Sequence, residues 1–124
     1  MRDENIIADK SLEFALRVVR LYKYLCEEKK EFVLSKQVLR SGTSIGANIK
    51  EALHAQSTKD FIAKLHISLK EASETEYWLT LLSQSGYITE EQYSSINDDC
   101  VEIIRILTSI INTTKKNYNN QTNS

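Results

Sequence analysis

The chain has 124 residues, of which 41% are hydrophobic and 27% are charged, and its formal net charge is −1. This length suits one domain with a substantial core, and the near-neutral charge excludes the strongly basic composition by which many nucleic-acid-binding proteins are recognised. The first ten residues lack the apolar core of a signal peptide, and no apolar run approaches the roughly 20 residues that span a membrane, so we expect a cytoplasmic protein.

A first helix is predicted from about Asp9 or Ser11 to Lys30, since the chain has no proline and only three glycines. Its apolar residues cover an arc of roughly 220°, whereas one core-facing stripe needs only somewhat more than 100°. The excess predicts a second surface that a partner would bury. Glu13 and Arg17 are expected to pair on the remaining, solvated arc. The apolar residues form two neighbouring lines, the first of Leu12, Ala15, Leu16, Val19, Tyr22 and Cys26 and the second of Phe14, Val18, Leu21 and Leu25.

Ser35 is expected to cap a second helix, which follows a short connection over residues 31–34. This helix contains Gly42 and Gly46, although each glycine in a helix interior costs roughly 1 kcal/mol. The two glycines lie one turn apart on the apolar stripe, so they predict the close approach of another helix. A line of small or polar residues runs beside the glycines and predicts a polar seam, that is, a contact between subunits of an oligomer. The alternative is a ligand site. The residues of this line are Ser41, Ser44, Asn48 and Glu51.

A third helix is predicted from about Thr58 to Ser83, opened by a capping box in which Ser57 precedes Asp60. Its core stripe carries the carboxylate of Glu76, which needs a donor. The expected partners of Glu76 are Arg40 and Asn48 of the second helix. Trp78 lies on a separate line and is expected outside the intramolecular core, on a surface of the kind enriched at interfaces.

Gly86 suits the left-handed position after the third helix, and Thr89 with Gln92 forms a capping box that opens the fourth. The polar tail over residues 117–124 has no apolar period and is expected to be disordered. Four helices joined by short loops predict an all-α fold, an antiparallel up-down-up-down four-helix bundle over residues 1–116.

No pattern in the sequence indicates catalysis or metal binding. Glu51 and His54 form a Glu-x-x-His motif, but the second motif and the further glutamates of a di-iron bundle are missing. The stretch 42–46 contains two glycines but lacks the Gly-Lys-Ser/Thr ending of a phosphate loop. Cys26 and Cys100 lie on apolar stripes and are expected to be buried, reduced thiols. We expect no enzyme activity, no cofactor and no metal.

Basic side chains gather on one side of the second helix, away from its apolar stripe. They are Lys36, Arg40, Lys50 and His54, against the single acid Glu51 between residues 34 and 56. Repetition of this patch in an oligomer would raise avidity, so it predicts weak, salt-sensitive RNA binding. The alternative is a solvated basic face that neighbouring acids partly neutralise.

Two blocks of the sequence resemble the family of four-helix proteins encoded by intervening sequences in bacterial 23S ribosomal RNA genes. The first block comprises Gln37–Arg40, Thr43–Ile45, Ala47–Ile49 and Glu51–Ala52, and the second runs from Phe61 to Leu79. The resemblance covers about residues 10–115. It implies an all-α bundle that assembles as a ring-shaped homopentamer. The accessory protein of diversity-generating retroelements belongs to the same group and binds nucleic acid and a reverse transcriptase.

We therefore expect a non-enzymatic homo-oligomer that acts as an adaptor or scaffold and binds RNA or a ribonucleoprotein weakly. The alternative functions are a scaffold that binds only protein and, third, an orphan enzyme. The residues expected to mediate helix packing or oligomer contacts are Gly42, Gly46, Ser44, Asn48, Glu51 and Trp78.

Overall fold

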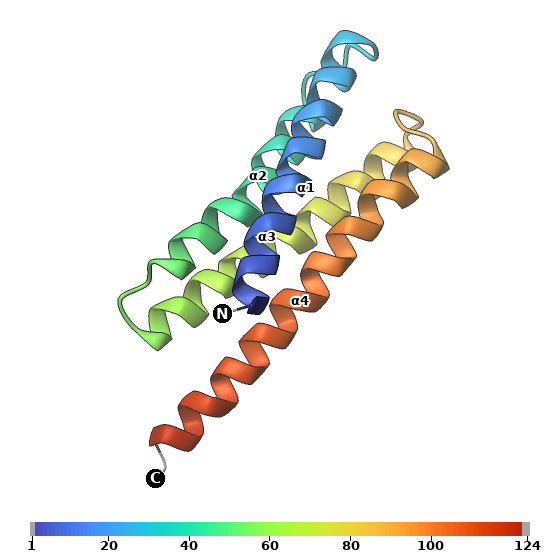
Figure 1. The fold of residues 1–124 in the computed structure, drawn as a ribbon. Coiled ribbons are helices and arrows are strands. Elements are labelled where there is room, and N and C mark those ends of the chain that lie inside the picture. Colours follow the sequence, from blue (N-terminus) through green and yellow to red (C-terminus); the bar gives the residue numbers. More distant parts are fainter. Residues whose placement is uncertain (1, 123–124) are drawn as a thin grey trace.

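The computed structural model describes residues 2–122 and consists of four long helices (Figure 1). They are α1 (Arg2–Glu27), α2 (Leu34–Leu53), α3 (Thr58–Gln84) and α4 (Glu90–Thr122). Consecutive helices run in opposite directions, and α4 packs against both α3 and α1. Over the described residues the diagonal pairs, α1 with α3 and α2 with α4, have no Cα atoms within 8 Å of each other. The predicted all-α four-helix bundle is confirmed.

Both terminal helices are longer than predicted. α1 begins at Arg2 rather than near Asp9, because Ile7 is buried and extends the core by one turn. α4 continues to Thr122, so residues 117–122, expected to be disordered, are helical. The half-buried Tyr118 shares a shallow hollow with Phe61 of α3, which gives this polar turn an apolar anchor. Residues 123–124 lie outside the described residues.

The start of α2 is capped by Glu31 rather than by Ser35 as predicted. One carboxylate oxygen of Glu31 accepts the backbone N–H groups of Val33 (3.2 Å) and Leu34 (3.0 Å), and the other accepts that of Ser35 (2.7 Å). The side chain of Glu31 is buried against this turn. A carboxylate satisfies three unpaired N–H groups and complements the positive end of the helix dipole, which one hydroxyl cannot do.

α1 ends at Glu27 rather than at the predicted Lys30, whereas the caps predicted at both ends of the α3–α4 turn and at the start of α3 are confirmed. The Ser57 hydroxyl oxygen accepts the Asp60 N–H at 3.0 Å and caps α3. At α4 the box is reciprocal, because Gln92 Oε1 accepts the Thr89 N–H (2.8 Å) and Thr89 Oγ1 accepts the Gln92 N–H (3.1 Å). Gly86 has a φ of 84°, the left-handed conformation expected after α3.

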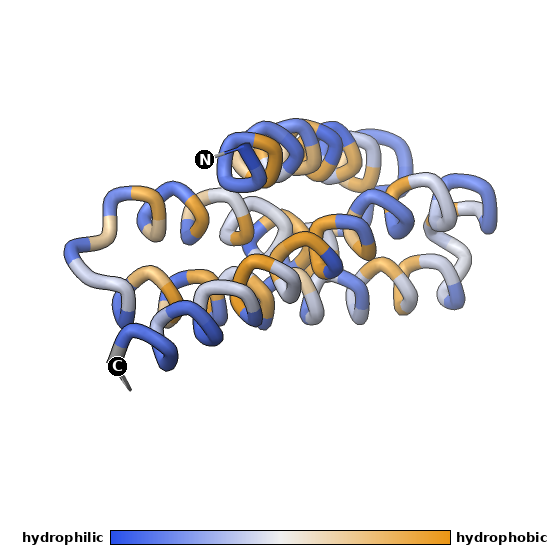
Figure 2. The backbone as a smooth tube through the Cα atoms, turned by 60° about the horizontal axis from the view of Figure 1, so that its bottom comes forward, coloured by the Kyte–Doolittle hydropathy of each residue, from blue (hydrophilic) through white to orange (hydrophobic). Residues whose placement is uncertain are grey.

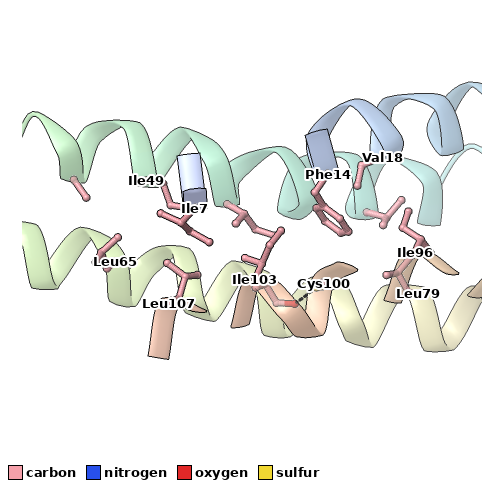
Figure 3. Packing of buried hydrophobic residues seen from close by; sticks show 14 of the residues in the cluster. Ile7, Phe14, Val18, Ile49, Leu65, Leu79, Ile96, Cys100, Ile103 and Leu107 are labelled. Atoms are coloured by element: carbon pink, nitrogen blue, oxygen red, sulfur yellow. Dashed lines mark hydrogen bonds between the residues drawn. The ribbon is translucent and has the colours of Figure 1, made fainter. Parts of the chain in front are cut away.

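The core is built from one apolar line of each helix (Figure 3). On α1 the second line, with Phe14 and Val18, makes the core, whereas Leu12 and Leu16 of the first line are 62% and 51% exposed. Apolar segments recur along all four helices (Figure 2). The labelled core side chains in Figure 3 are Ile7, Phe14, Val18, Ile49, Leu65, Leu79, Ile96, Cys100, Ile103 and Leu107.

Both cysteines are free thiols, as predicted, although only one is fully buried. Cys100 donates to the carbonyl of Ala72 at 3.3 Å and thereby joins α4 to α3. Burial, together with the nearby carboxylate of Glu76, raises the pKa of Cys100 to about 12. Cys26 is half-buried, with its Sγ 3.7 Å from Ser35 Oγ. The raised pKa of Cys100 is the opposite of the lowered pKa of a reactive cysteine.

Candidate interaction surfaces

Gly42 and Gly46 lie where α2 crosses α1. A Cβ atom at Gly42 would lie 2.8 Å from both methyl groups of Val18, too close for any side chain. A Cβ atom at Gly46 would lie 3.3 Å from Ser11 Oγ, which is tight but close to an ordinary contact. The two glycines therefore permit close packing between α1 and α2 within one chain.

Most of the exposed large hydrophobic side chains in the described residues belong to α1, to α2 or to the connection between them. We call this surface the α1–α2 apolar face, and its members are Leu12, Leu16, Phe32, Val33 and Leu53. The least exposed of them, Leu53, is 39% exposed and the most exposed, Val33, is 70% exposed. Leu12 and Leu53 line the same groove, and exposed apolar surface that is contiguous marks an interaction site.

A groove of about 460 Å³ runs along the α1–α2 apolar face. Small side chains line it, among them Ala8, Ser11 and Gly46, while Leu12 and Leu53 add branched apolar side chains. Because the helices approach closely here and their facing side chains are small, the face is hollowed. Such a hollow accepts a projecting apolar side chain from another chain.

A second exposed apolar surface lies on α3. Ile67 is 42% exposed and Tyr77 is 60% exposed, and the Tyr77 ring stands edge-on to that of Trp78 with centroids 5.0 Å apart. Trp78 itself is half-buried at the edge of the core, and its indole N–H donates to Glu74 at 2.8 Å. We call Ile67, Tyr77 and Trp78 the α3 apolar patch. Since α3 is diagonal to α1, this patch and the exposed leucines of α1 belong to different sides of the bundle.

The predicted polar seam makes its contacts within the chain, between α2 and α3 or along α2. Ser41 Oγ accepts a hydrogen bond from Thr75 Oγ1 at 2.9 Å, and Glu51 forms an ion pair with Lys64 at 3.1 Å. The two remaining members bond to their own helix: Ser44 Oγ donates to the carbonyl of Arg40 (2.7 Å) and Asn48 Nδ2 to that of Ser44 (2.9 Å). These side chains already have partners without a second copy.

The structure divides the basic residues of α2 between different environments. The Arg40 guanidinium forms ion pairs with Glu71, at 3.3 Å, and with Glu74, so α3 neutralises its charge. Lys50 and His54 are exposed and line the α1–α2 groove, and Lys36 is exposed near the start of the helix. Only part of the predicted cluster therefore remains available to an anionic ligand.

Two pairings expected from the sequence are wrong. Arg40 pairs with Glu71 and Glu74 rather than with Glu76, and Asn48 donates to its own helix. The carboxylate of Glu76 instead lies close enough to Cys100 of α4 to contribute to the raised pKa of that thiol. The reason is the position of each residue around the axis of α3. Residues 71 and 74 lie on the side of α3 that faces α2, and residue 76 lies on the side that faces α4.

Arg17 also has a different partner from the predicted Glu13. Its guanidinium donates to Asp99 of α4 at 2.6 Å and to the hydroxyl and carbonyl oxygens of Ser95. Lys10 repeats this arrangement with Glu102 at 2.8 Å. Ion pairs between helices thus tie α1 to α4 and replace the pair predicted along one helix.

Within residues 2–122, no three His, Cys, Asp or Glu side chains gather in a way that could hold a metal ion. In the same part of the chain, none of the four helices combines the length and apolar character needed to cross a membrane.

A family model described as 23S rRNA-intervening sequence protein matches residues 3–109. The chain belongs to this family. A solved structure from Bacteroides thetaiotaomicron, described as a protein of unknown function from the S23 ribosomal protein family, is 65% identical. It covers 89% of this chain and 98% of its own length, with a TM-score of 0.88. No curated protein matches the chain.

In this member of the family Phe32 and Val33 are exposed, whereas the sequence alone was interpreted as placing them in a short connection with no role. The sequence did contain a pattern that indicates their exposure, because two consecutive large apolar residues in a four-residue connection have little room to be buried. The interpretation of the sequence also missed Glu31 as the helix cap. The signal there was a carboxylate three and four residues before the N–H groups of Leu34 and Ser35.

Proposed function

We propose that this protein is a non-enzymatic scaffold that assembles with copies of itself. The observation that supports this proposal most is that one bundle presents two separate apolar surfaces, the α1–α2 apolar face and the α3 apolar patch. In the assembly, the α1–α2 apolar face of one copy packs on the α3 apolar patch of the next. Burying apolar surface contributes roughly 25 cal/mol per Å², so side chains such as Leu12 and Val33 favour association.

The shapes of the two surfaces support contact between unlike faces rather than like faces. The α1–α2 apolar face contains the 460 Å³ groove, whereas the α3 apolar patch projects Tyr77, which is 60% exposed. A hollow and a projection complement each other, while two hollows leave a void. Contacts between unlike faces close into a ring when the rotation per copy allows it. The family resemblance supports five copies.

RNA binding along α2 stays a prediction. Lys36 is exposed outside the groove and supports it, and repetition around a ring would multiply its weak contacts, whereas Lys50 and His54 line the groove that the next copy fills. The ion pairs of Arg40 with Glu71 and Glu74 favour the protein-only scaffold. The scaffold is therefore the better supported function, and an RNA-binding adaptor is the second candidate.

The mass of the protein in solution tests the proposal. Light scattering coupled to gel filtration at micromolar concentration should give about five times the 14.3 kDa chain mass. Because apolar contacts dominate the two surfaces, the mass should persist when the salt concentration is raised to about 1 M, where exposed ion pairs are screened. A stable monomer at low salt would contradict self-assembly.

A further inference from the structure

A second groove lies between α1 and α4, apart from both apolar surfaces. It measures about 430 Å³, within the range of pockets that bind small molecules. Its apolar lining comes from Leu21, Ile88 and Ile96, the last two nearly fully buried. Figure 1 shows α1 and α4 diverging towards the end of the bundle where α1 ends and α4 begins.

The polar lining of this groove consists mostly of hydrogen-bond donors. Arg20 is exposed and has no ion pair among residues 2–122. Gln92 uses its Oε1 to accept the Thr89 N–H, which leaves its NH₂ group as the free donor. Ser95 Oγ accepts from Arg17, so its own O–H is left to donate. Glu91 supplies a carboxylate acceptor. A groove with this lining favours a ligand rich in acceptors.

Tyr24 favours a flat ligand, and the nearby ammonium of Lys29 favours a negative charge. The half-buried ring of Tyr24 borders the groove, with the Lys29 ammonium 5.9 Å from the ring centroid. An aromatic ring next to an apolar floor suits the stacking of a planar group.

We propose that the α1–α4 groove binds a nucleoside 5′-phosphate. The base lies against Tyr24 and the apolar floor, the phosphate pairs with Arg20, and Glu91 accepts an N–H of the base. The same group occurs as a free mononucleotide and at the 5′ end of an RNA strand. The proposal does not rest on self-assembly, because neither apolar surface contributes a residue to this groove.

Calorimetric titration of the full chain with AMP tests the proposal, with adenosine and inorganic phosphate as partial ligands and a 5′-phosphorylated trinucleotide as the strand end. AMP should bind at one site per chain, and each partial ligand at least tenfold more weakly. Arg20→Gln should lower the affinity for AMP about tenfold or more, since it removes a charge-assisted hydrogen bond. Arg105→Gln is the matched control, because Arg105 is an exposed arginine of α4 outside the groove, and it should bind AMP as the wild type does.

A second variant, Tyr24→Leu, keeps an apolar side chain but removes the aromatic face, and it should also weaken AMP binding. Circular dichroism of each variant shows whether the bundle is retained. Tighter binding of the trinucleotide than of AMP, lost in Arg20→Gln, would support the strand end as the source of the ligand. Absence of binding by both AMP and the trinucleotide at millimolar concentration would overturn the proposal. An Arg20→Gln variant that is folded and binds AMP with unchanged affinity would also overturn the proposal.

Discussion

At Gly42 the missing side chain lets α2 lie directly against Val18 of α1. The Cβ of an alanine there would lie 2.8 Å from both Val18 methyl groups, while at Gly46 the nearest atom is Ser11 Oγ at 3.3 Å. The sequence placed both glycines on an apolar face but treated them alike. Their difference depends on which residue of α1 lies opposite, and spacing within α2 contains no information on that.

Gly42→Ala should therefore lower the free energy of unfolding by about 1–3 kcal/mol, the usual cost of overpacking. Gly46→Ala should be nearly neutral, because alanine improves helix propensity by roughly 1 kcal/mol against a mild contact. Urea unfolding followed by circular dichroism measures both. Combining Gly42→Ala with Val18→Ala should cost less than the sum of the single changes, since the clash is removed. A Gly42→Ala variant as stable as the wild type would refute this account of the helix crossing.

At the scale of single helices, much of the structure was predictable from local patterns. The capping boxes at Ser57 and Thr89 were predictable, because each depends on two residues that are three positions apart. Which of the two apolar lines of α1 faces the core was not predictable, since either line is apolar enough to do so. Contact with Gly42 selects the line of Phe14 and Val18. The pairing of Arg40 with Glu71 likewise depends on how α2 and α3 are aligned.

The N-terminus of α2 depends on Glu31. Glu31→Ala should cost about 1–2 kcal/mol, because it removes an acceptor shared by three backbone N–H groups. Glu31→Gln should cost less, since its amide oxygen can still accept. Hydrogen exchange should show faster exchange for the N–H groups of Val33, Leu34 and Ser35 in the alanine variant. Exchange at wild-type rates there would show that Glu31 is dispensable as a cap.

RNA binding by α2 is tested best without Arg40, because Arg40→Glu would also place a carboxylate beside Glu71 and Glu74. Lys36→Glu combined with Lys50→Glu changes charges that are exposed in the single chain, and light scattering shows whether the assembly, whose groove Lys50 lines, is retained. If the α2 face binds a structured RNA at low salt, this double variant should weaken binding at least tenfold. Lys23→Glu with Lys115→Glu gives the same charge change elsewhere and should have a smaller effect. Absence of wild-type binding at low salt would leave the protein-only scaffold.

For the whole molecule, the wide apolar arc of α1 predicted a surface beyond the core, and the exposure of Leu12 and Leu16 agrees with it. The position of the second surface was harder to predict. Trp78 was expected to be the outward aromatic residue of α3, but the structure half-buries it and exposes Tyr77 more fully. Adjacent residues on a helix differ by 100°, so a modest rotation of α3 decides which of them faces solvent.

Mixing two variants tests the proposed contact between unlike faces most directly. Leu12→Glu with Leu16→Glu disables the α1–α2 apolar face, and Ile67→Glu with Tyr77→Glu disables the α3 apolar patch. Each variant alone should have the 14.3 kDa mass of one chain by light scattering. An equimolar mixture should contain particles of about twice that mass, because each variant supplies the surface that the other lacks. A mixture that stays monomeric, or an α3 variant that keeps the wild-type mass, would contradict the account.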